Sequence, residues 1–287
     1  MAIITFKSNE LKETGQTLSI SAIATQMAIE HNRKILLIST SFKDQTLENC
    51  FWEVGKTVND NFNQGASIGV ESGIEGLIRV IASNKTSPEI IKNYSKIILR
   101  DRLDILPSPK TQQYSEYEEI ALKYPEVLKI ASMYYDIVLV DLSKRMSPQC
   151  EKQILEMSDI VVTNMTQRLK SIDEFAELRE KAEFYKRKNI MLLIGRYDAF
   201  SKYNVKNITR YLRERNNVSI IPYNTLYFEA CSEGKIIDFF LGLKTVSELD
   251  RNYLFIKEVN EDVTAIFNKL QELQMRLWSL KKGENNE

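Results

Sequence analysis

The stretch from Lys7 to Thr17 reads KSNELKETGQT, and it decides the fold of this chain. It follows a short apolar run, Ala2 to Phe6, which is typical of a buried parallel strand. It precedes a pattern of apolar residues at three- and four-residue spacing, Leu18 to Glu30, which predicts a helix. The stretch is therefore the loop of a strand–loop–helix unit.

Many proteins carry a phosphate-binding loop at such a position. Its backbone N–H groups point at a phosphate, and a lysine in a Gly-Lys-Ser/Thr ending neutralises the negative charge. In this chain Gly15 and Thr17 fit that ending, but Gln16 stands where the lysine is expected. The frame of a phosphate-binding loop is kept, whereas its central charge is missing.

The rest of the chain alternates short apolar runs with helical patterns. This alternation predicts an α/β fold, a doubly wound and mostly parallel sheet of about seven strands flanked by helices. The first two strands, joined by a helix, should form a right-handed crossover. The predicted strands are Ala2–Phe6, Ile35–Ile38, Leu103–Leu106, Ile137–Asp141, Ile160–Thr163, Ile190–Ile194 and Val218–Ile221.

Two long helical patterns bear on the domain organisation. One runs from Tyr114 to Tyr134, where Pro125 marks a break or a new start. The other runs from about Val259 to Leu280. We expect one α/β domain over residues 1–245, and a C-terminal helical extension over residues 246–287 that packs on the domain or on a partner.

Composition excludes several classes of protein. The formal net charge of zero argues against a surface that binds polyanions everywhere. Cys50, Cys150 and Cys231 lack the spacing of a metal site and are expected to be free thiols. His31, the single histidine, makes histidine-based catalysis or metal binding an unattractive hypothesis. Neither a signal peptide nor a membrane-spanning run is visible, which favours a cytoplasmic protein.

Several segments together resemble the ParA/MinD branch of the P-loop ATPases. This branch includes plasmid and chromosome partition ATPases, septum-site ATPases and TadZ/CpaE-like localisation proteins. Gly15 to Ile38 is similar to the family's first βαβ unit, Tyr135 to Asp141 to its Walker B strand, and Ile194 to Asp198 with Ile221 to Asn224 to its nucleotide-base region. The order and spacing of the segments carry the resemblance, which runs from Ala2 to about Leu243 and implies a P-loop NTPase fold.

Carried over residue by residue, the resemblance implies a degenerate nucleotide site. Thr17 and Asp141 would hold Mg²⁺ if Mg-ATP binds. No cofactor is expected, and ATP or ADP with Mg²⁺ is the alternative. The residues that would line the site are Gly15, Gln16, Thr17, Leu18, Asp141 and Pro222.

Four positions depart from the family's pattern. Leu11 falls on the signature lysine and Gln16 on the phosphate lysine, while Gly195 replaces the asparagine that reads adenine. The stretch Ser39-Thr40-Ser41 replaces the Asp-x-Asp that helps position the attacking water. A lysine–phosphate contact contributes about 1.5–3 kcal/mol, so each loss weakens ATP roughly tenfold to over a hundredfold.

The remaining charges and the surviving residues leave alternatives open. Glu13 adds a negative charge beside the phosphates, whereas Lys7 or Lys12 could swing in for the missing lysine. Asp141 could instead cap the following turn, and Thr17 could serve as a helix N-terminal residue. Pro222 could simply end its strand.

Two further surfaces suggest partners. Basic residues could contact DNA, as they do in relatives, although interspersed glutamates favour solvated helix faces. The end of the last helix, MRLWSLKK from Met275 to Lys282, could reach a membrane, although packing on the domain or a partner is preferred. The basic residues are Lys181, Lys186, Arg187, Lys188, Arg210, Arg213 and Arg215.

The sequence thus favours a degenerate ParA/MinD/TadZ-like pseudo-ATPase that acts as a localisation or scaffolding protein in a bacterial pilus, secretion, conjugation or partition system. We expect a homodimer with a protein partner, in the cytoplasm or peripheral at the membrane. The alternative is a divergent but active ATPase in DNA partition or cell-division positioning, and a third hypothesis is a DNA-binding partition accessory.

Overall fold

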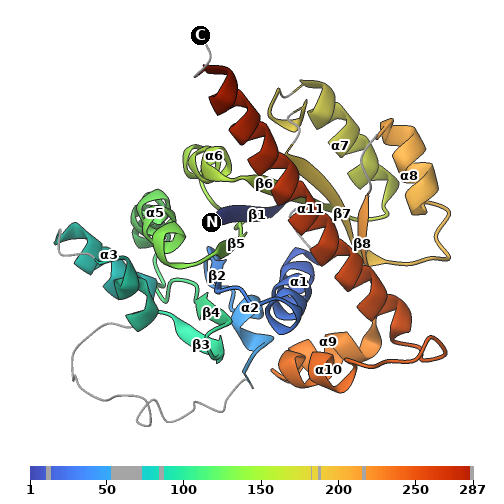
Figure 1. The fold of residues 1–287 in the computed structure, drawn as a ribbon, viewed down its shortest axis with the longest axis horizontal. Helices are drawn as coiled ribbons and strands as arrows, with labels where there is room; N and C mark the ends of the chain where they lie inside the picture. The colour runs from blue at the N-terminus through green and yellow to red at the C-terminus, as the bar shows by residue number, and fades with distance from the viewer. Residues whose placement is uncertain are drawn as a thin grey trace.

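The computed structural model of this chain describes residues 1–10, 14–52, 73–83, 87–181, 183–186, 189–214 and 218–284. Within these residues eight strands form one sheet, in the order β3-β4-β2-β5-β1-β6-β7-β8 (Figure 1). The strands are β1 (Ala2–Ser8), β2 (Ile35–Ser39), β3 (Lys96–Leu99), β4 (Leu103–Leu106), β5 (Ile137–Asp141), β6 (Ile160–Met165), β7 (Ile190–Tyr197) and β8 (Ser219–Pro222).

The sheet confirms the predicted α/β fold and adds one strand to the predicted seven. All neighbouring strands pair in parallel except β3, which runs antiparallel to β4 at the sheet edge. The run from Lys96 to Leu99 was missed because an edge strand lacks the full burial of a central one, and Ile97 is 55% exposed. An antiparallel edge on a parallel sheet is common in doubly wound folds.

Strand β1 lies at the centre of the sheet, and all seven of its residues are buried. It pairs with β5 on one side, where Phe6 lies opposite Asp141, and with β6 on the other, where Ser8 lies opposite Asn164. The carboxyl ends of these three strands therefore meet at one edge of the sheet. Ligands of open α/β sheets bind at this edge.

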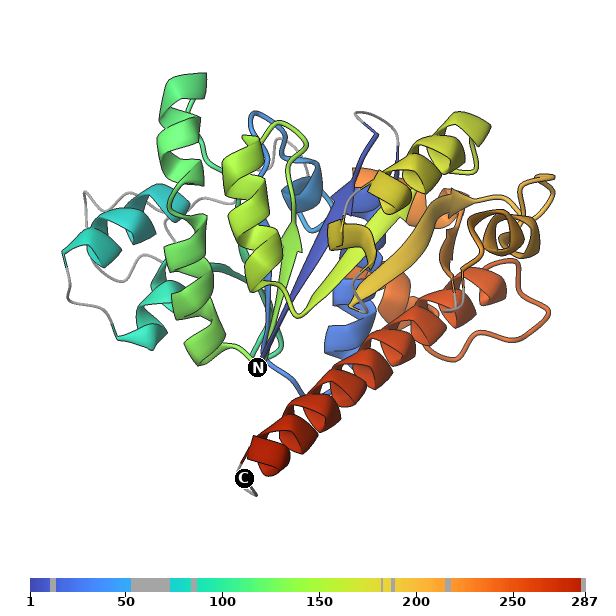
Figure 2. The same ribbon diagram turned by 90° about the horizontal axis from the view of Figure 1, so that it is seen from above.

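Helices cover both faces of the sheet (Figure 2). One face packs against α1, α2, α9, α10 and α11, and the other against α3 to α8. The helices are α1 (Gln16–Glu30), α2 (Thr46–Asn49), α3 (Ile74–Ala82), α4 (Tyr114–Ala121), α5 (Tyr124–Tyr134), α6 (Pro148–Met157), α7 (Leu169–Lys181), α8 (Val205–Leu212), α9 (Thr225–Ser232), α10 (Ile236–Gly242) and α11 (Tyr253–Glu284), with 3-10 turns at Pro88–Asn93 and Glu183–Lys186.

Some element boundaries differ from those that the sequence predicts. Helix α1 begins two residues early, at Gln16, so that Gln16 and Thr17 belong to its first turn. The pattern from Tyr114 to Tyr134 divides into α4 and α5, and Pro125 lies in the first turn of α5, as a new start requires. The three cysteines are buried and free.

The last helix is longer than predicted at both ends. Its first half buries Phe255, Val259 and Val263 in the same core as α1 and β1. Its C-terminal turns extend past the sheet (Figure 2), and there Met275 and Trp278 are 59% and 63% exposed. None of the described helices is both long enough and apolar enough to cross a membrane.

Candidate functional site

The candidate site lies where the carboxyl ends of β1 and β5 meet the first turn of α1. Gly15 precedes the helix with a φ of 72°, a left-handed conformation that glycine adopts without strain. This turn directs Gln16 and Thr17 towards the end of β5, where Asp141 lies. The structure thus brings together five of the six residues expected to line a nucleotide site, and Pro222 lies apart at the end of β8.

Gln16, at the position of the missing lysine, turns inward rather than towards the cleft. Its Nε2 donates to the Asp141 carboxylate at 2.6 Å, and it lies 3.0 Å from the Leu142 carbonyl oxygen and 3.2 Å from that of Phe6. An amide nitrogen carries two hydrogens, one fewer than these acceptors. The Oε1 atom is buried and finds no hydrogen-bond partner among the described residues.

Asp141 is held by two side chains from the first turn of α1. Its Oδ1 accepts from Gln16, and its Oδ2 accepts from the Thr17 hydroxyl at 2.9 Å. Burial raises the pKa of Asp141 to about 6, and these two hydrogen bonds act in the opposite direction. Asp141 therefore ties the end of β5 to the start of α1, a role beyond capping the next turn.

This arrangement does not fit Mg²⁺. The ion demands oxygen ligands at about 2.0–2.1 Å in a near-octahedral arrangement. Both oxygens of Asp141 already accept hydrogen bonds, and the Thr17 hydroxyl is one of the donors. An amide N–H of Gln16 also points at the carboxylate, where a cation would have to approach. The described residues include no cluster of three acidic, histidine or cysteine side chains that could hold a metal.

The hypothesis that Lys7 replaces the missing lysine is wrong. Lys7 Nζ lies 2.6 Å from a carboxylate oxygen of Glu151 in α6, and 5.4 Å from the centre of the Tyr185 ring. Burial lowers the pKa of Lys7, but Tyr185 and Glu151 raise it further, so the ammonium stays charged where it is. Lys7 thus fastens β1 to α6. The substitutions at Leu11 and Glu13, and the alternative lysine Lys12, lie outside the described residues.

Gly195 has a structural role at the position of the adenine-reading asparagine. A Cβ atom added there would lie 2.4 Å from the carbonyl oxygen of Thr14 and 3.0 Å from Asn164 Nδ2. Asn164 in turn donates to that carbonyl at 2.6 Å. The absence of a side chain at Gly195 therefore lets the end of β7 pack against the loop that precedes α1.

A cleft of about 570 Å³ opens in front of the first turn of α1. Its lining includes four basic residues that the sequence analysis did not identify: Lys43, Lys144, Arg145 and Arg196. Each follows the carboxyl end of a strand, β2, β5 or β7, or belongs to that end. This position was the signal that could have revealed them, because such ends converge at one edge of a parallel sheet.

The neighbouring place expected for a base is almost closed. Leu18, Pro222 and Phe228 are among the residues around a hollow of only about 20 Å³ beside Gly15. This volume is about that of one water molecule, and a purine ring would not fit. Adenine therefore does not fit beside Pro222 in this conformation, just as Mg²⁺ does not fit beside Asp141.

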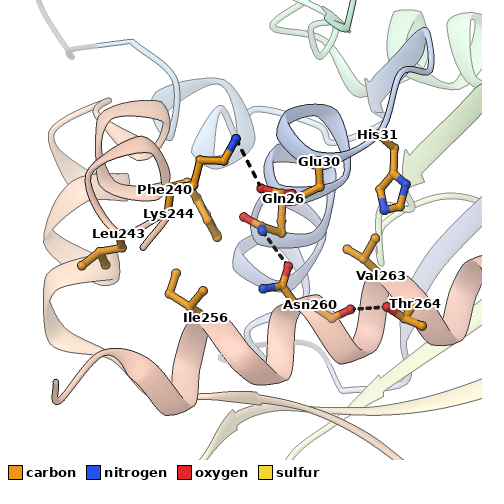
Figure 3. A pocket seen from close by; sticks show the side chains of 10 residues that line it. All are labelled: Gln26, Glu30, His31, Phe240, Leu243, Lys244, Ile256, Asn260, Val263 and Thr264. Atoms are coloured by element: carbon orange, nitrogen blue, oxygen red, sulfur yellow. Dashed lines mark hydrogen bonds and ion pairs between the residues drawn. The ribbon is translucent and has the colours of Figure 1, made fainter. Parts of the chain in front are cut away.

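A second hollow, of about 370 Å³, lies at the opposite end of α1, between α10 and α11 (Figure 3). Gln26 Nε2 donates to Asn260 Oδ1 at 2.6 Å across its floor. Lys244 lies 4.0 Å from Glu30 at its rim. These polar groups satisfy one another, so the first-turn cleft is the stronger candidate.

Solved structures of ParA and MinD ATPases share the fold of this chain at low sequence identity. A ParA family ATPase from Chlorobium tepidum has a TM-score of 0.68 at 17% identity, over 92% of this chain and 98% of its own. The septum site-determining protein MinD from Pyrococcus horikoshii, complexed with Mg-ADP, has a TM-score of 0.63 at 17% identity, over 93% and 98%. The cell division ATPase MinD from Pyrococcus furiosus has 0.64 at 14%, over 93% and 100%.

No protein-family model matches the sequence, and no curated protein is detectably similar to it. The fold similarity therefore comes from the structure. It shows an α/β fold with an eight-stranded, mostly parallel sheet flanked by helices, like that of the ParA/MinD P-loop ATPases.

Proposed function

We propose that this chain is a ParA/MinD-like pseudo-ATPase, which acts as a localisation or scaffolding protein through protein–protein contacts. Its setting would be a bacterial pilus, secretion, conjugation or partition system, where a TadZ-like protein is the nearest functional analogue. We further propose that it forms a homodimer, held by protein contacts rather than by sandwiched nucleotide.

One observation carries the proposal: Gln16 and Thr17 occupy both oxygens of Asp141. Phosphoryl transfer depends on charge neutralisation and positioning. Here the lysine position carries a neutral amide, which is turned towards Asp141 and away from the cleft. The metal position is closed by hydrogen bonds between the residues that would hold the ion. The fold is kept, whereas the groups that would drive hydrolysis are used to fasten α1 to β5.

Phosphate release from ATP with Mg²⁺ tests the loss of hydrolysis. We expect the same background rate from the wild-type chain and from Asp141→Asn, which keeps the size of the side chain. Turnover that disappears in Asp141→Asn would refute the proposal. The scaffolding role is tested separately by light scattering: the dimer mass should be unchanged when ATP, Mg²⁺ or a chelator is added, and a dimer that requires nucleotide would contradict it.

A divergent active ATPase is the second candidate, and Lys144 favours it. Its Nζ donates to the Thr14 hydroxyl at 3.1 Å, so an ammonium group does lie against the loop, supplied by the segment after β5. If Lys144 replaces the loop lysine in catalysis, Lys144→Met should abolish turnover together with Asp141→Asn. Equal background rates in all three proteins would reject this candidate.

A further inference from the structure

We propose that the first-turn cleft binds the polyphosphate portion of its ligand through basic residues of the strand-end loops, without selecting a nucleotide base. The residues are Lys43, Lys144, Arg145 and Arg196. This inference deepens the proposed function and rests on it, because it assigns a ligand class to a cleft whose hydrolytic groups are used elsewhere.

The charge of the lining is the first argument. Four basic side chains face two acidic residues, and both acidic residues are engaged. Asp44 accepts from the backbone N–H of Thr46 at 2.9 Å at the start of α2, and Asp141 accepts from α1. Within the described residues no carboxylate forms an ion pair with any of the four cations. The cleft therefore keeps an excess of positive charge that attracts anions.

The backbone beneath two of these cations is the second argument. Lys43 and Arg196 have φ values of 55° and 54°, in the left-handed region that disfavours residues with a Cβ. Among the described residues only two other non-glycine residues, Asp101 and Arg213, have a positive φ. Strained residues of this kind concentrate at ligand sites. Half of those in the described chain thus direct a cation into one cleft.

Gly15 shows that the position of Arg196 is built into the loop. A Cβ on Gly15 would lie 3.0 Å from Arg196 Cγ, so the missing side chain leaves room for the arginine to cross the loop. Gly195 makes the same approach possible from the other side, because it packs on the Thr14 carbonyl. The two glycines together hold a guanidinium beside the start of α1.

The start of α1 completes the anion site. The first N–H groups of a helix have no acceptor within it, and they favour phosphate by both hydrogen bonding and dipole. The N-terminal cap of α1, Gly15, supplies no side-chain hydrogen bond. Lys144 extends over this end: its Nζ contacts the Thr14 hydroxyl, and burial lowers its pKa. The chain therefore supplies an ammonium to the loop from outside it.

The closed base hollow sets the specificity. The cleft of about 570 Å³ is large enough for a chain of phosphates, whereas the hollow beside Pro222 is about 20 Å³. Inorganic tripolyphosphate and nucleoside triphosphates share the same phosphate chain, so they should bind alike, and the base should add little.

Calorimetric titration with sodium tripolyphosphate, ATP and GTP in the presence of EDTA tests the proposal. We expect similar dissociation constants for the three ligands. Lys144→Met should weaken each by about tenfold to a hundredfold, because a charge-assisted contact is lost. Lys129→Met, which removes an exposed charge on α5, is the matched control and should bind as wild type does. If Lys144→Met fails to fold, Arg145→Gln at an exposed position should show the same selective weakening.

Several results would overturn the proposal: no binding of any phosphate ligand, ATP binding far more tightly than GTP and tripolyphosphate, or equal weakening by Lys129→Met. A hexaglutamate peptide that binds as tightly as tripolyphosphate would also do so, because the site would then recognise carboxylates as well. Phosphate release is measured in parallel. Binding with turnover would refute the loss of hydrolysis but keep the cleft assignment, whereas neither binding nor turnover would do the reverse.

Discussion

Asp141→Asn should make the protein more stable at neutral pH, because it removes a carboxylate that folding takes out of water. Asp141 is 2% exposed, and its burial raises its pKa from the ordinary 3.8 to about 6. In the unfolded chain the same carboxyl group is in water. The amide of the variant keeps an oxygen that can accept from Gln16, so the packing at the end of β5 is preserved.

The size and sign of the effect follow from the two pKa values. Because the folded value lies above the unfolded one, Asp141 favours the folded state fully below about pH 4, and this contribution is lost as the pH rises through about 6. One pKa unit corresponds to about 1.4 kcal/mol. Ionisation of Asp141 therefore lowers the free energy of unfolding by about 3 kcal/mol between pH 4 and pH 7.

Urea unfolding of both proteins at several pH values between about 4 and 8 measures this effect. The free energy of the variant minus that of the wild type should rise by about 3 kcal/mol over this range, since contributions common to both proteins cancel. Glu119→Gln, which neutralises an exposed carboxylate of α4, shows what the removal of a surface charge does. A difference for Asp141→Asn that is independent of pH, or that falls as the pH rises, would refute the reasoning.

Three other substitutions test the packing around the site. Gly195→Ala should destabilise the protein by about 1–3 kcal/mol in urea unfolding, because the new Cβ would lie 2.4 Å from the Thr14 carbonyl oxygen; Gly242→Ala, whose Cβ meets nothing within 4 Å, should be tolerated. Lys7→Met should cost about 1–3 kcal/mol by breaking the 2.6 Å ion pair with α6, yet leave phosphate binding in calorimetry unchanged. Tyr227→Phe should cost about 1 kcal/mol in thermal unfolding, because its hydroxyl bonds to the Leu18 carbonyl oxygen at 2.7 Å are lost.

The features of the fold that repeat along the chain could be predicted from the sequence. β1 and β5 are short, apolar and buried on both faces, so a continuous apolar run was a sufficient signal. The placement of Asp141 beside Thr17 followed from the parallel order of these strands. The edge strand β3 gave no such signal, because exposed Lys96 and Ile97 make it look like a loop.

The character of the site depended on contacts between distant segments, which a sequence pattern does not specify. The substitution at Gln16 was visible, but its inward turn depends on acceptors supplied by β1 and by the segment after β5. Lys144 and Arg196 were overlooked because they lie far from the loop in sequence and have no fixed spacing from it. The role of Gly195 likewise became apparent only when the Thr14 carbonyl was found against it.

The surroundings of the Gln16 nitrogen also bear on how this protein could change over generations. Codons for glutamine and lysine differ in their first base alone, so a single nucleotide exchange would convert one residue into the other. Three oxygens already surround that nitrogen, and an ammonium group has three hydrogens to offer them. The interior of this protein would thus accept the ancestral side chain at little steric cost, and a gene bank of spontaneous revertants would reveal whether the charge alone restores anything that the remaining substitutions do not prevent.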